Sequence, residues 1–180
     1  VVIPVREGSS RIPEKIFLPF EDDKNLLEWK IAQILEVQSP DLIFLSSNSE
    51  KVAETAGRMG VNFLPRSDYL SVGHKASFSE VITGVVQDLP TEHFAWVTVV
   101  VPLMGPQEYR TGFEHYLRNV ARGGQFDSLV SVNLLKEYFW NDSEPMNYRA
   151  DRYHTIRQEL PNLYRVTNGL YMRSKEATLR

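Results

Sequence analysis

The sequence predicts an α/β protein of three layers, with a mostly parallel, twisted sheet covered by helices on both faces. Several short runs are rich in β-branched residues without alternating polar ones, which is typical of strands buried on both faces. Amphipathic stretches lie between these runs, and two of them open with capping-box spacing. Strand and helix signals alternate at intervals of roughly 20 to 30 residues, as they do in βαβ units.

The first half of the chain contains three predicted strands and two predicted helices. Residues 1–5 (V-V-I-P-V), 41–46 and 61–64 predict strands, and the polar residues 6–15 predict a long loop after the first. Residues 26–35 predict an amphipathic helix with Asn25 or Asp23 as its N-cap. Ser47 and Glu50 have capping-box spacing before a second helix, and Gly60 is placed to end it. The face of the first helix is marked by Leu26, Leu27, Lys30, Ile31, Ile34 and Leu35.

The second half continues the alternation up to residue 133. Ser77 and Glu80 have capping-box spacing and predict a helix through Val86. Residues 94–101 (F-A-W-V-T-V-V-V) give the strongest strand signal, and residues 107–120 predict a helix that stops at Gly123 and Gly124. Residues 128–133 and 169–172 predict two further strands. Residues 136–164 have no clean period, so we interpret residues 1–180 as one domain with 136–165 as a substrate-side or dimerisation excursion.

Composition excludes several classes of protein. The chain has 180 residues, a formal net charge of −3 and no cysteine, which argues against a general nucleic-acid binder and excludes disulfides and thiolate metal sites. No apolar stretch approaches the roughly 20 residues that span a bilayer, so we expect no membrane span. A reducing compartment such as the cytoplasm fits this composition. The chain opens at Val1 inside an apolar run, and we expect a short lead and a C-terminal segment beyond Arg180 to be missing.

The loop at residues 6–15 carries the sharpest chemical signal. Arg6, Arg11 and Lys15 follow the first strand directly, together with the small residues Gly8, Ser9 and Ser10. Small residues let backbone N–H groups approach a phosphate, and the cations could neutralise a triphosphate and a leaving pyrophosphate. A solvated basic loop is an equally good interpretation of the spacing alone, and the P-loop pattern is absent.

Five segments in order resemble the acylneuraminate cytidylyltransferase (CMP-sialic acid synthetase) family. Residues 3–15, I-P-V-R-E-G-S-S-R-I-P-E-K, resemble its opening signature, roughly I-x-A-R-x-G-S-K-x-I-P-x-K-N. Two further segments lie in the first half of the chain: P-F with N-L-L-E-W at 19–29, and P-R with K-A-S at 65–77. Two lie in the second half: S-L-V-S-V with Lys136 and Trp140 at 128–140, and R-Q-E-L-P with Y-R and N-G-L-Y at 157–171. The resemblance covers essentially the whole chain and implies a Rossmann-like fold of the nucleotide-diphospho-sugar transferase type.

The family joins CTP to the hydroxyl of an acidic, nine-carbon or similar sugar and releases pyrophosphate. By resemblance, Arg6 and Lys15 would be catalytic. The nucleotide would contact Arg6, Gly8, Ser9, Ser10, Arg11, Lys15, Arg66 and Ser77. The sugar would contact Val101, Lys136, Arg157, Asn168 and Tyr171. Several of these residues have a simpler alternative from their sequence context. Ser77 is sufficient as a helix cap, Asn168-Gly169 is a common turn, and Tyr171 could lie in the core. Arg66 follows a proline and could be a surface residue, and Arg157 lies among other charges.

The chain also departs from the family pattern. Ser10 stands where the family has lysine, and Ile16 where it has an asparagine that contacts the nucleotide. Val101, Leu103 and Met104 replace a sugar-contacting glutamine and a Thr-Ser pair, which makes this wall more apolar and should shift acceptor specificity. Two rival interpretations follow: a nucleotidyltransferase for another sugar or base, or a sugar-nucleotide binding protein that has lost catalysis.

Cofactor and partners follow from the resemblance alone. Mg²⁺ is implied, but no metal ligands are assigned, because the family's metal-binding aspartates lie beyond the last predicted strand. The adjacent pair Asp22-Asp23 sits at a helix entry, where capping is the better interpretation. The expected partners are CTP, an acidic sugar and a second copy of the chain in a homodimer, with no nucleic acid and no membrane.

Overall fold

The computed structural model describes residues 1–180 except residues 7, 9–11 and 73–74. It divides into two compact units: unit 1 comprises Val1–Val130 and Asn168–Arg180, and unit 2 comprises Ser131–Thr167. This division lies close to the predicted 136–165 excursion, whose role stays a prediction. In the described part of the chain, no helix is long and apolar enough to cross a membrane.

A six-stranded sheet in the order β5-β4-β1-β6-β8-β7 organises unit 1, and parts of its last two strands belong to unit 2. The first four positions are β5 (Asn62–Pro65), β4 (Phe44–Ser47), β1 (Val2–Pro4) and β6 (His93–Val97), which pair in parallel. The strand β8 (Leu163–Ser174) then pairs antiparallel with β6, with Trp96 opposite Tyr171, and β7 (Ser128–Leu135) follows it. The predicted fold class, a mostly parallel sheet, is confirmed.

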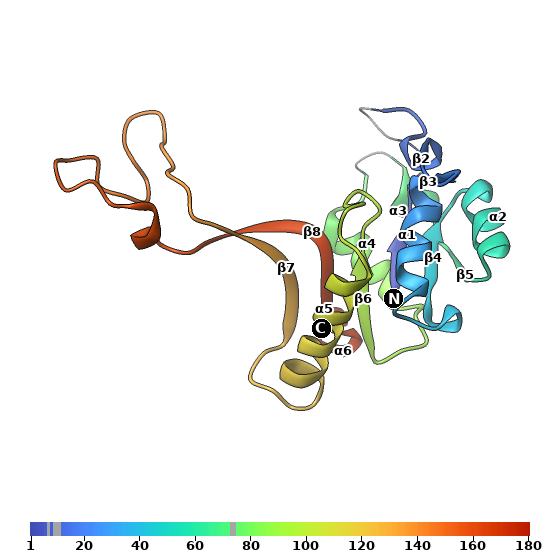
Figure 1. Ribbon diagram of the computed structural model, residues 1–180. Coiled ribbons are helices and arrows are strands. Elements are labelled where there is room, and N and C mark those ends of the chain that lie inside the picture. Colours follow the sequence, from blue (N-terminus) through green and yellow to red (C-terminus); the bar gives the residue numbers. More distant parts are fainter. Residues whose placement is uncertain (7, 9–11, 73–74) are drawn as a thin grey trace. The chain divides into compact units, whose positions relative to one another are not determined.

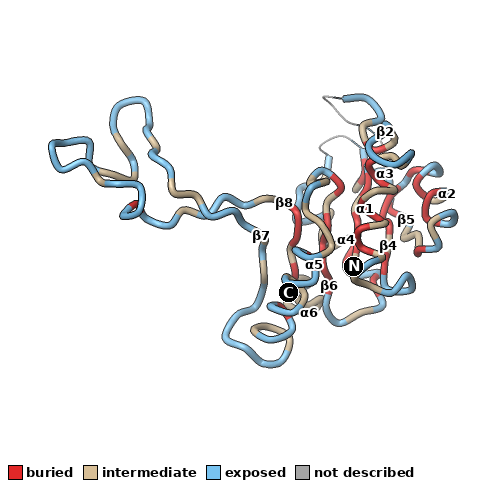
Figure 2. The backbone as a smooth tube through the Cα atoms, in the orientation of Figure 1, coloured by how far each residue is buried: buried red, intermediate tan, exposed pale blue. Residues whose placement is uncertain are grey.

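Helices cover both faces of this sheet, as the sequence predicts. Successive residues of a strand point to opposite faces. Ile3, Ala95 and Val97 pack in one core with α1 (Leu26–Leu35), α2 (Glu50–Met59) and α5 (Pro106–Tyr116). Val2 and Trp96 pack in a second core with α4 (Phe78–Val86). Figure 2 shows the buried residues concentrated along the central strands and the inner sides of these helices.

Local capping signals explain where the main helices begin and end. Asn25 and Glu28 form a capping box at the start of α1, and Ser77 and Glu80 form another at the start of α4, as predicted. Gly60 closes α2 with a φ of 69°, a left-handed conformation that glycine adopts without strain. The predicted capping box of Ser47 and Glu50 is wrong. Ser47 lies in β4, and Ser49 is the N-cap of α2 without a side-chain hydrogen bond.

The remaining elements complete the chain (Figure 1). The predicted strand at residues 94–101 is shorter than expected: β6 ends at Val97, and residues 99–100 and 102–103 form turns. The predicted helix at 107–120 is α5 followed by a π-helical turn, Leu117–Ala121. The shorter elements are η1 (Lys15–Phe17), β2 (Pro19–Glu21), β3 (Lys24–Asn25), η2 (Pro40–Leu42), α3 (Asp68–Ser71), η4 (Arg157–Glu159) and α6 (Lys175–Leu179).

Candidate active site

A cavity of about 320 Å³ lies where β1, β5 and β6 end. The carboxyl ends of parallel strands meet at one edge of a sheet, and this edge is where α/β proteins bind their ligands. The cavity contains two arginines, and none of its described lining residues is acidic. Its lining consists of Pro4, Arg6, Arg66, Tyr69, Leu70, Ser71, Ala76, Phe78, Val81, Trp96 and Thr98.

Arg66 is the best-fixed cation of this cavity. Its side chain follows β5 directly, and the residue is only 9% exposed. Its Nη2 donates a hydrogen bond to the backbone oxygen of Val5 at 2.8 Å, and its Nε donates to Ser71 Oγ at 3.0 Å. Both acceptors are neutral, and no carboxylate among the described residues pairs with this guanidinium. Three of its five N–H donors therefore remain for a ligand.

Arg6 adds a second positive charge at the end of β1. Its Nε donates a hydrogen bond to the backbone oxygen of Gly8 at 3.1 Å. Burial, and secondly the charge of Arg6, lower the pKa of Arg66. Two like charges near each other in a partly buried site repel, so an anion bound between them would relieve the repulsion.

The segment after β5 forms one wall of the cavity. Tyr69 of α3 donates a hydrogen bond from its hydroxyl to Glu80 Oε1 at 2.9 Å, and this bond raises the pKa of the tyrosine. Ser77 Oγ accepts a hydrogen bond from the backbone N–H of Glu80 at 3.2 Å, which is its capping role. Its neighbours Ala76 and Phe78 line the cavity, whereas Ser77 itself is not among the lining residues.

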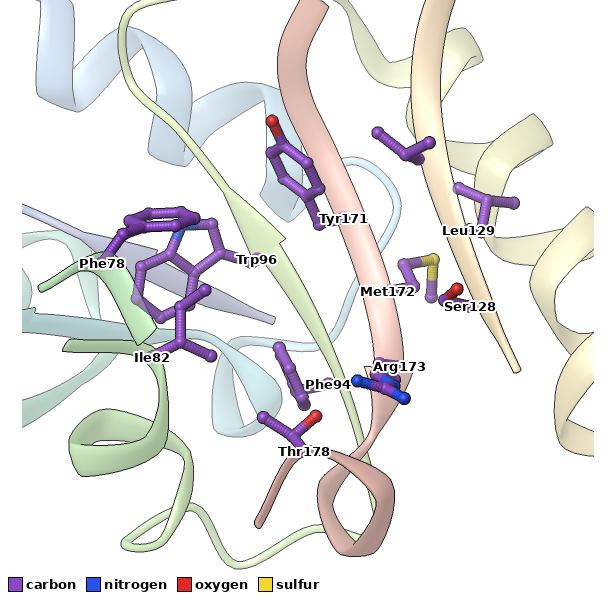
Figure 3. Close-up of a pocket in the computed structure, with 11 residues that line it drawn as sticks. Phe78, Ile82, Phe94, Trp96, Ser128, Leu129, Tyr171, Met172, Arg173 and Thr178 are labelled. Atoms are coloured by element: carbon purple, nitrogen blue, oxygen red, sulfur yellow. The ribbon is translucent and has the colours of Figure 1, made fainter. Parts of the chain in front are cut away.

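A second cavity, of about 260 Å³, lies on the same face of the sheet beside α4 and β8 (Figure 3). Phe78 and Trp96 belong to both cavities, and their rings meet edge to face with centroids 6.3 Å apart. Tyr171 and Met172 line the second cavity, together with Arg173. The predicted contact residue Tyr171 therefore lines the second cavity and is not among the residues that line the cavity of Arg66.

The loop residues predicted to contact the nucleotide are only partly described. Ser9, Ser10 and Arg11 lie outside the described residues. Gly8 is exposed, and a Cβ added to it would meet nothing within 4 Å, so a ligand could approach its backbone. Lys15 opens η1, and its ammonium makes no hydrogen bond or ion pair with any described residue. Ile16, where the family has asparagine, is 6% exposed and packs in the core.

The predicted sugar contacts of unit 1 occupy two places. The backbone oxygen of Asn168 accepts a hydrogen bond from Thr98 Oγ1 at 2.6 Å, and Thr98 lines the cavity with the two arginines. Asn168 has a φ of 60° and its Oδ1 accepts a hydrogen bond from the Tyr171 hydroxyl. Val101 lies in the turn after β6, where its backbone oxygen accepts a hydrogen bond from Lys30 Nζ at 3.0 Å.

Unit 2 brings its two predicted sugar contacts together. The Lys136 ammonium donates a hydrogen bond to the backbone oxygen of Leu160, and Arg157 Nε donates to the backbone oxygen of Lys136 at 2.8 Å. Neither side chain forms an ion pair with a described residue. Both cations are thus held by neutral carbonyl oxygens and remain able to pair with a carboxylate.

No metal-binding cluster is present among the described residues. There, no group of three His, Cys, Asp or Glu side chains is close enough to hold an ion. The donor set that Mg²⁺ prefers, several carboxylate oxygens around one point, is therefore not supplied by the described part of this chain.

Comparison with known proteins agrees with this geometry. The family model described as Cytidylyltransferase matches residues 1–172. The chain belongs to the cytidylyltransferase family. Members of this family are nucleotidyltransferase enzymes, so the predicted enzyme class is confirmed. The cavity with two arginines at the sheet edge is consequently the candidate nucleotide site of this cytidylyltransferase.

Individual relatives are distant in sequence but cover nearly the whole chain. A pseudaminic acid cytidylyltransferase of Campylobacter jejuni is 23% identical over 185 residues, covering 99% of this chain and 79% of the relative. The structure of a CMP:2-keto-3-deoxy-manno-octonic acid synthetase complexed with CTP has a TM-score of 0.69 at 13% identity, covering 98% and 74% of the two chains. A cytidylyltransferase from Leptospira borgpetersenii has a TM-score of 0.63 at 15% identity, covering 98% and 60%.

Several residues around this site have no counterpart in the sequence analysis. Tyr69, Phe78 and Thr98 line the cavity, and no local pattern in the sequence singles them out. Lys30 is different, because it is a lysine at an apolar-face position of a predicted helix. That position signals a buried charge with dedicated partners.

Proposed function

We propose that this cytidylyltransferase joins CTP to an acidic sugar of the sialic-acid-like class and produces a CMP-sugar and pyrophosphate. The observation that carries the proposal is the cavity at the sheet edge, which has two arginines and no acidic group among its described lining residues. A triphosphate is the most strongly anionic part of the two substrates, and it fits a site of this charge.

The nucleotide would occupy unit 1. Arg66 would donate its remaining N–H groups to the phosphates, because its other donors are already fixed on Val5 and Ser71. Arg6 and Lys15 would act as the catalytic cations, with the backbone around Gly8 close to the phosphates. The proposal also includes Ser9, Ser10 and Arg11 of the same loop. Ser77 would contribute in addition to capping α4.

The sugar carboxylate would bind cations of unit 2. Lys136 and Arg157 are linked to each other through a backbone oxygen and have no acidic partner among the described residues. Arginine can bind a carboxylate through two parallel hydrogen bonds, which would fix the orientation of the sugar. The proposal also keeps Asn168, Tyr171 and Val101 of unit 1 as sugar contacts, on the resemblance alone.

The transfer itself needs positioning and charge stabilisation more than covalent help from the protein. The sugar hydroxyl oxygen bonds to the α-phosphorus, and its proton passes to water. The bond from this phosphorus to the bridging oxygen breaks, and pyrophosphate leaves with the electron pair. Arg6 and Lys15 would stabilise the negative charge that develops on the leaving group. Mg²⁺ is implied by the resemblance and would offset the charge of the triphosphate, and the described residues assign it no ligands.

Two further parts of the proposal concern the surroundings of the enzyme. We propose a cytoplasmic location, where CTP is available, and a homodimer formed through unit 2. Exposed aromatic side chains in unit 2 support the dimer, because large apolar groups left in water favour association. Trp140 is 57% exposed, Tyr153 63% and Tyr164 61%.

The test is pyrophosphate release by the intact natural protein with Mg²⁺. CTP, GTP, UTP and ATP are each assayed against a panel of nonulosonic and octulosonic acids. Release with CTP and one acidic sugar is the expected result and names the acceptor. Release with another base would identify the protein as a nucleotidyltransferase that uses a different nucleotide, an alternative that the altered residues Ile16 and 101–104 leave open. Nucleotide binding without release from any pair would favour a binding protein that has lost catalysis, or an acceptor outside the panel.

A further inference from the structure

The second cavity, beside α4 and β8, is a separate hollow of about 260 Å³. Its floor consists of cross-strand neighbours, with Phe94 of β6 opposite Arg173 of β8. Trp96 and Tyr171 form the next such pair on the same face, because they lie two positions along each strand. Figure 3 shows Phe78, at the start of α4, beside these side chains. Every described lining residue belongs to unit 1, so the cavity forms within one compact unit.

One buried polar atom of this lining has no hydrogen-bond partner among the described residues, Arg173 Nε. The other polar side chains of the lining are occupied. Ser128 Oγ donates a hydrogen bond to Asp127 Oδ1 at 2.7 Å, and Thr178 Oγ1 donates to the backbone oxygen of Ser174 at 2.9 Å. Arg173 Nη2 donates to Asp127 Oδ2 at 3.0 Å. A buried donor without an acceptor destabilises a fold, so Nε calls for an acceptor that the described chain does not supply.

The charges at this end of the cavity select a neutral ligand. The carboxylate of Asp127 neutralises the guanidinium of Arg173. The hydrogen bond from Ser128, and then the charge of Arg173, hold the pKa of Asp127 below its usual range, so this carboxylate is ionised at neutral pH. An anion would be repelled by Asp127, and a cation would be repelled by the guanidinium. A neutral molecule with a hydrogen-bond acceptor avoids both conflicts and satisfies Nε.

The remaining walls favour a flat, apolar ligand. Phe94 and Trp96 are buried, whereas Phe78 at the rim is 63% exposed. Aromatic rings attract one another in edge-to-face or offset-stacked arrangements, so a planar ring would pack among these side chains and Tyr171. Sites for small molecules usually measure about 300–1,000 Å³. A cavity of about 260 Å³ is therefore suited to a ligand of one or two rings.

The same chemistry distinguishes this cavity from a site for an acidic sugar. Such a sugar carries a carboxylate and several hydroxyl groups, and each of them needs a partner when it is buried. The described lining offers a single unpaired buried donor, and its one cation is already neutralised. Tyr171 contributes only its ring, because its hydroxyl donates a hydrogen bond to Asn168 Oδ1.

Two structural links connect this cavity to the candidate nucleotide cavity. Phe78 and Trp96 line both cavities, and their ring centroids are 6.3 Å apart. Asn168 provides the second link, because its backbone oxygen accepts a hydrogen bond from Thr98 of the nucleotide cavity and its Oδ1 accepts one from Tyr171. A molecule in the second cavity would therefore contact walls that the nucleotide cavity shares.

We propose that the second cavity is an effector site for a neutral, planar molecule with one hydrogen-bond acceptor, which Arg173 Nε binds. The bound molecule and the nucleotide change each other's affinity through the shared walls, and thermodynamic linkage requires the same factor in both directions. The coupling rests on the proposed function, because it assigns the neighbouring cavity to CTP. Binding of the neutral molecule does not depend on it.

The first test is calorimetric titration of the intact natural protein with three indoles. 3-Acetylindole carries a neutral acceptor, 3-ethylindole carries none, and indole-3-carboxylate is an anion. We expect 3-acetylindole to bind about tenfold more tightly than 3-ethylindole, because its carbonyl accepts a hydrogen bond from a charged donor. Indole-3-carboxylate should bind no more tightly than 3-ethylindole. Equal affinities for the three indoles, or no binding of 3-acetylindole at about 1 mM, would overturn the proposal.

Arg173→Met assigns this preference to the unpaired donor. The variant keeps the apolar stem, and the ion pair that it removes is partly exposed and contributes little stability. Affinity for 3-acetylindole should fall to that for 3-ethylindole, whose own affinity should change less than about twofold. The matched control is Arg58→Met, which removes a surface arginine paired with Glu28 and should leave every indole affinity unchanged. A persisting preference for 3-acetylindole in Arg173→Met contradicts the role of Nε.

Asp127→Asn tests the charge argument and does not depend on the folding of Arg173→Met. This change removes the carboxylate and leaves Arg173 Nε in place, so the affinity for indole-3-carboxylate should rise about tenfold. An unchanged affinity for this anion would contradict the selection of a neutral ligand.

The coupling is measured by titrating CTP into the protein saturated with 3-acetylindole, and 3-acetylindole into the protein saturated with CTP. Both dissociation constants should shift by the same factor, and no shift in either would refute the effector role. Competitive displacement of 3-acetylindole by N-acetylneuraminate would identify the cavity as an acceptor site and overturn the proposal. Absence of CTP binding to the unmodified protein would refute the proposed function instead, and the three indoles alone would then decide whether the cavity binds a neutral ligand.

Discussion

Replacing Arg66 by methionine separates the structural role of this side chain from its role in nucleotide binding. The residue is 9% exposed, its guanidinium donates to Val5 and Ser71, and it lines a cavity without a described acidic residue. Methionine keeps most of the apolar volume of the stem but removes the charge and every donor. Both stability and CTP affinity should fall, for different reasons.

The two effects can be estimated from the contacts. A hydrogen bond to a charged group contributes about 1.5–3 kcal/mol, so the loss of two would cost about 3–6 kcal/mol. Relief from burying a cation beside Arg6 offsets part of this cost, as the lowered pKa of Arg66 indicates. Loss of one further charge-assisted bond to phosphate should weaken CTP binding about ten- to hundredfold.

The assay is calorimetric titration of CTP into the folded variant, together with its thermal unfolding. The matched control is Arg58→Met, which removes a surface arginine of α2 that pairs with Glu28. The side chain of Arg58 is 58% exposed. A surface ion pair contributes at most about 1 kcal/mol, so this control should bind CTP normally. Arg66→Lys should bind CTP with intermediate affinity, because lysine keeps the charge but lacks the planar guanidinium and its paired N–H donors. Unchanged CTP affinity in folded Arg66→Met would refute the assignment of this cavity to the nucleotide.

Three further changes test single features of the structure. Ser77→Ala should lower the free energy of unfolding by about 1 kcal/mol through loss of the α4 cap. Ser77→Asp should keep the cap, because aspartate is also a good N-cap residue. A higher KM for CTP in Ser77→Asp would then indicate that a phosphate binds near this position. Ile16→Asn restores the family residue and should lower the free energy of unfolding by about 2–4 kcal/mol, because its amide would be unpaired in the core. Ile16→Val should lower it by only about 1 kcal/mol, and chemical denaturation measures both values. The pKa of Lys30 is about 8 in the folded protein, against 10.5 ordinarily. Between pH 8 and 10.5 the unfolded chain therefore keeps the Lys30 proton that the folded protein has lost. The unfolding free energy should rise over this range by up to about 3 kcal/mol. Lys30→Met should lack that rise, and equal slopes for both proteins would contradict a buried, titrating Lys30.

The parts of the fold predicted from the sequence are those fixed by local chemistry. The capping boxes at Asn25 and Ser77 satisfy backbone N–H groups with side chains three residues apart, so a short window contains all the information. Gly60 is similar, because only its own backbone angle is at issue. The buried strands follow from runs of β-branched residues, which have few alternatives to a sheet covered on both faces.

The failed details depend on partners distant in sequence. Ser47 has the spacing of a cap, but β4 extends through it because its backbone pairs with β5. Residues 98–101 have the composition of a strand, yet the chain leaves the sheet after Val97. Donors from α1, about 70 positions earlier, satisfy the carbonyl oxygens of the following turn instead of a strand neighbour. No window around residue 100 contains that information.

The candidate site also combines features that local sequence determines with features that depend on distant partners. Its cations come from motifs that the sequence displays, with Arg6 after the first strand and Arg66 after the third. The walls come from packing, because Phe78 and Trp96 meet only after α4 has folded onto the sheet. Cations could therefore be predicted from the sequence, and the shape of the cavity could not.

Two of the departures from the family pattern, Ile16 and the turn at 101–104, lie against one element, α1. Ile16 packs in the same core as Leu27 and Ile31 of α1, and Lys30, which is also buried on that helix, holds the turn at 101–104. An asparagine at 16 and a hydrogen-bonding turn at 101–104 would each present a polar group to a ligand. In this chain the first position is turned into the core, and the second has its backbone oxygens tied to a buried ammonium. Because α1 contacts both positions, the two changes are better understood as one repacking around this helix than as independent losses of catalytic residues.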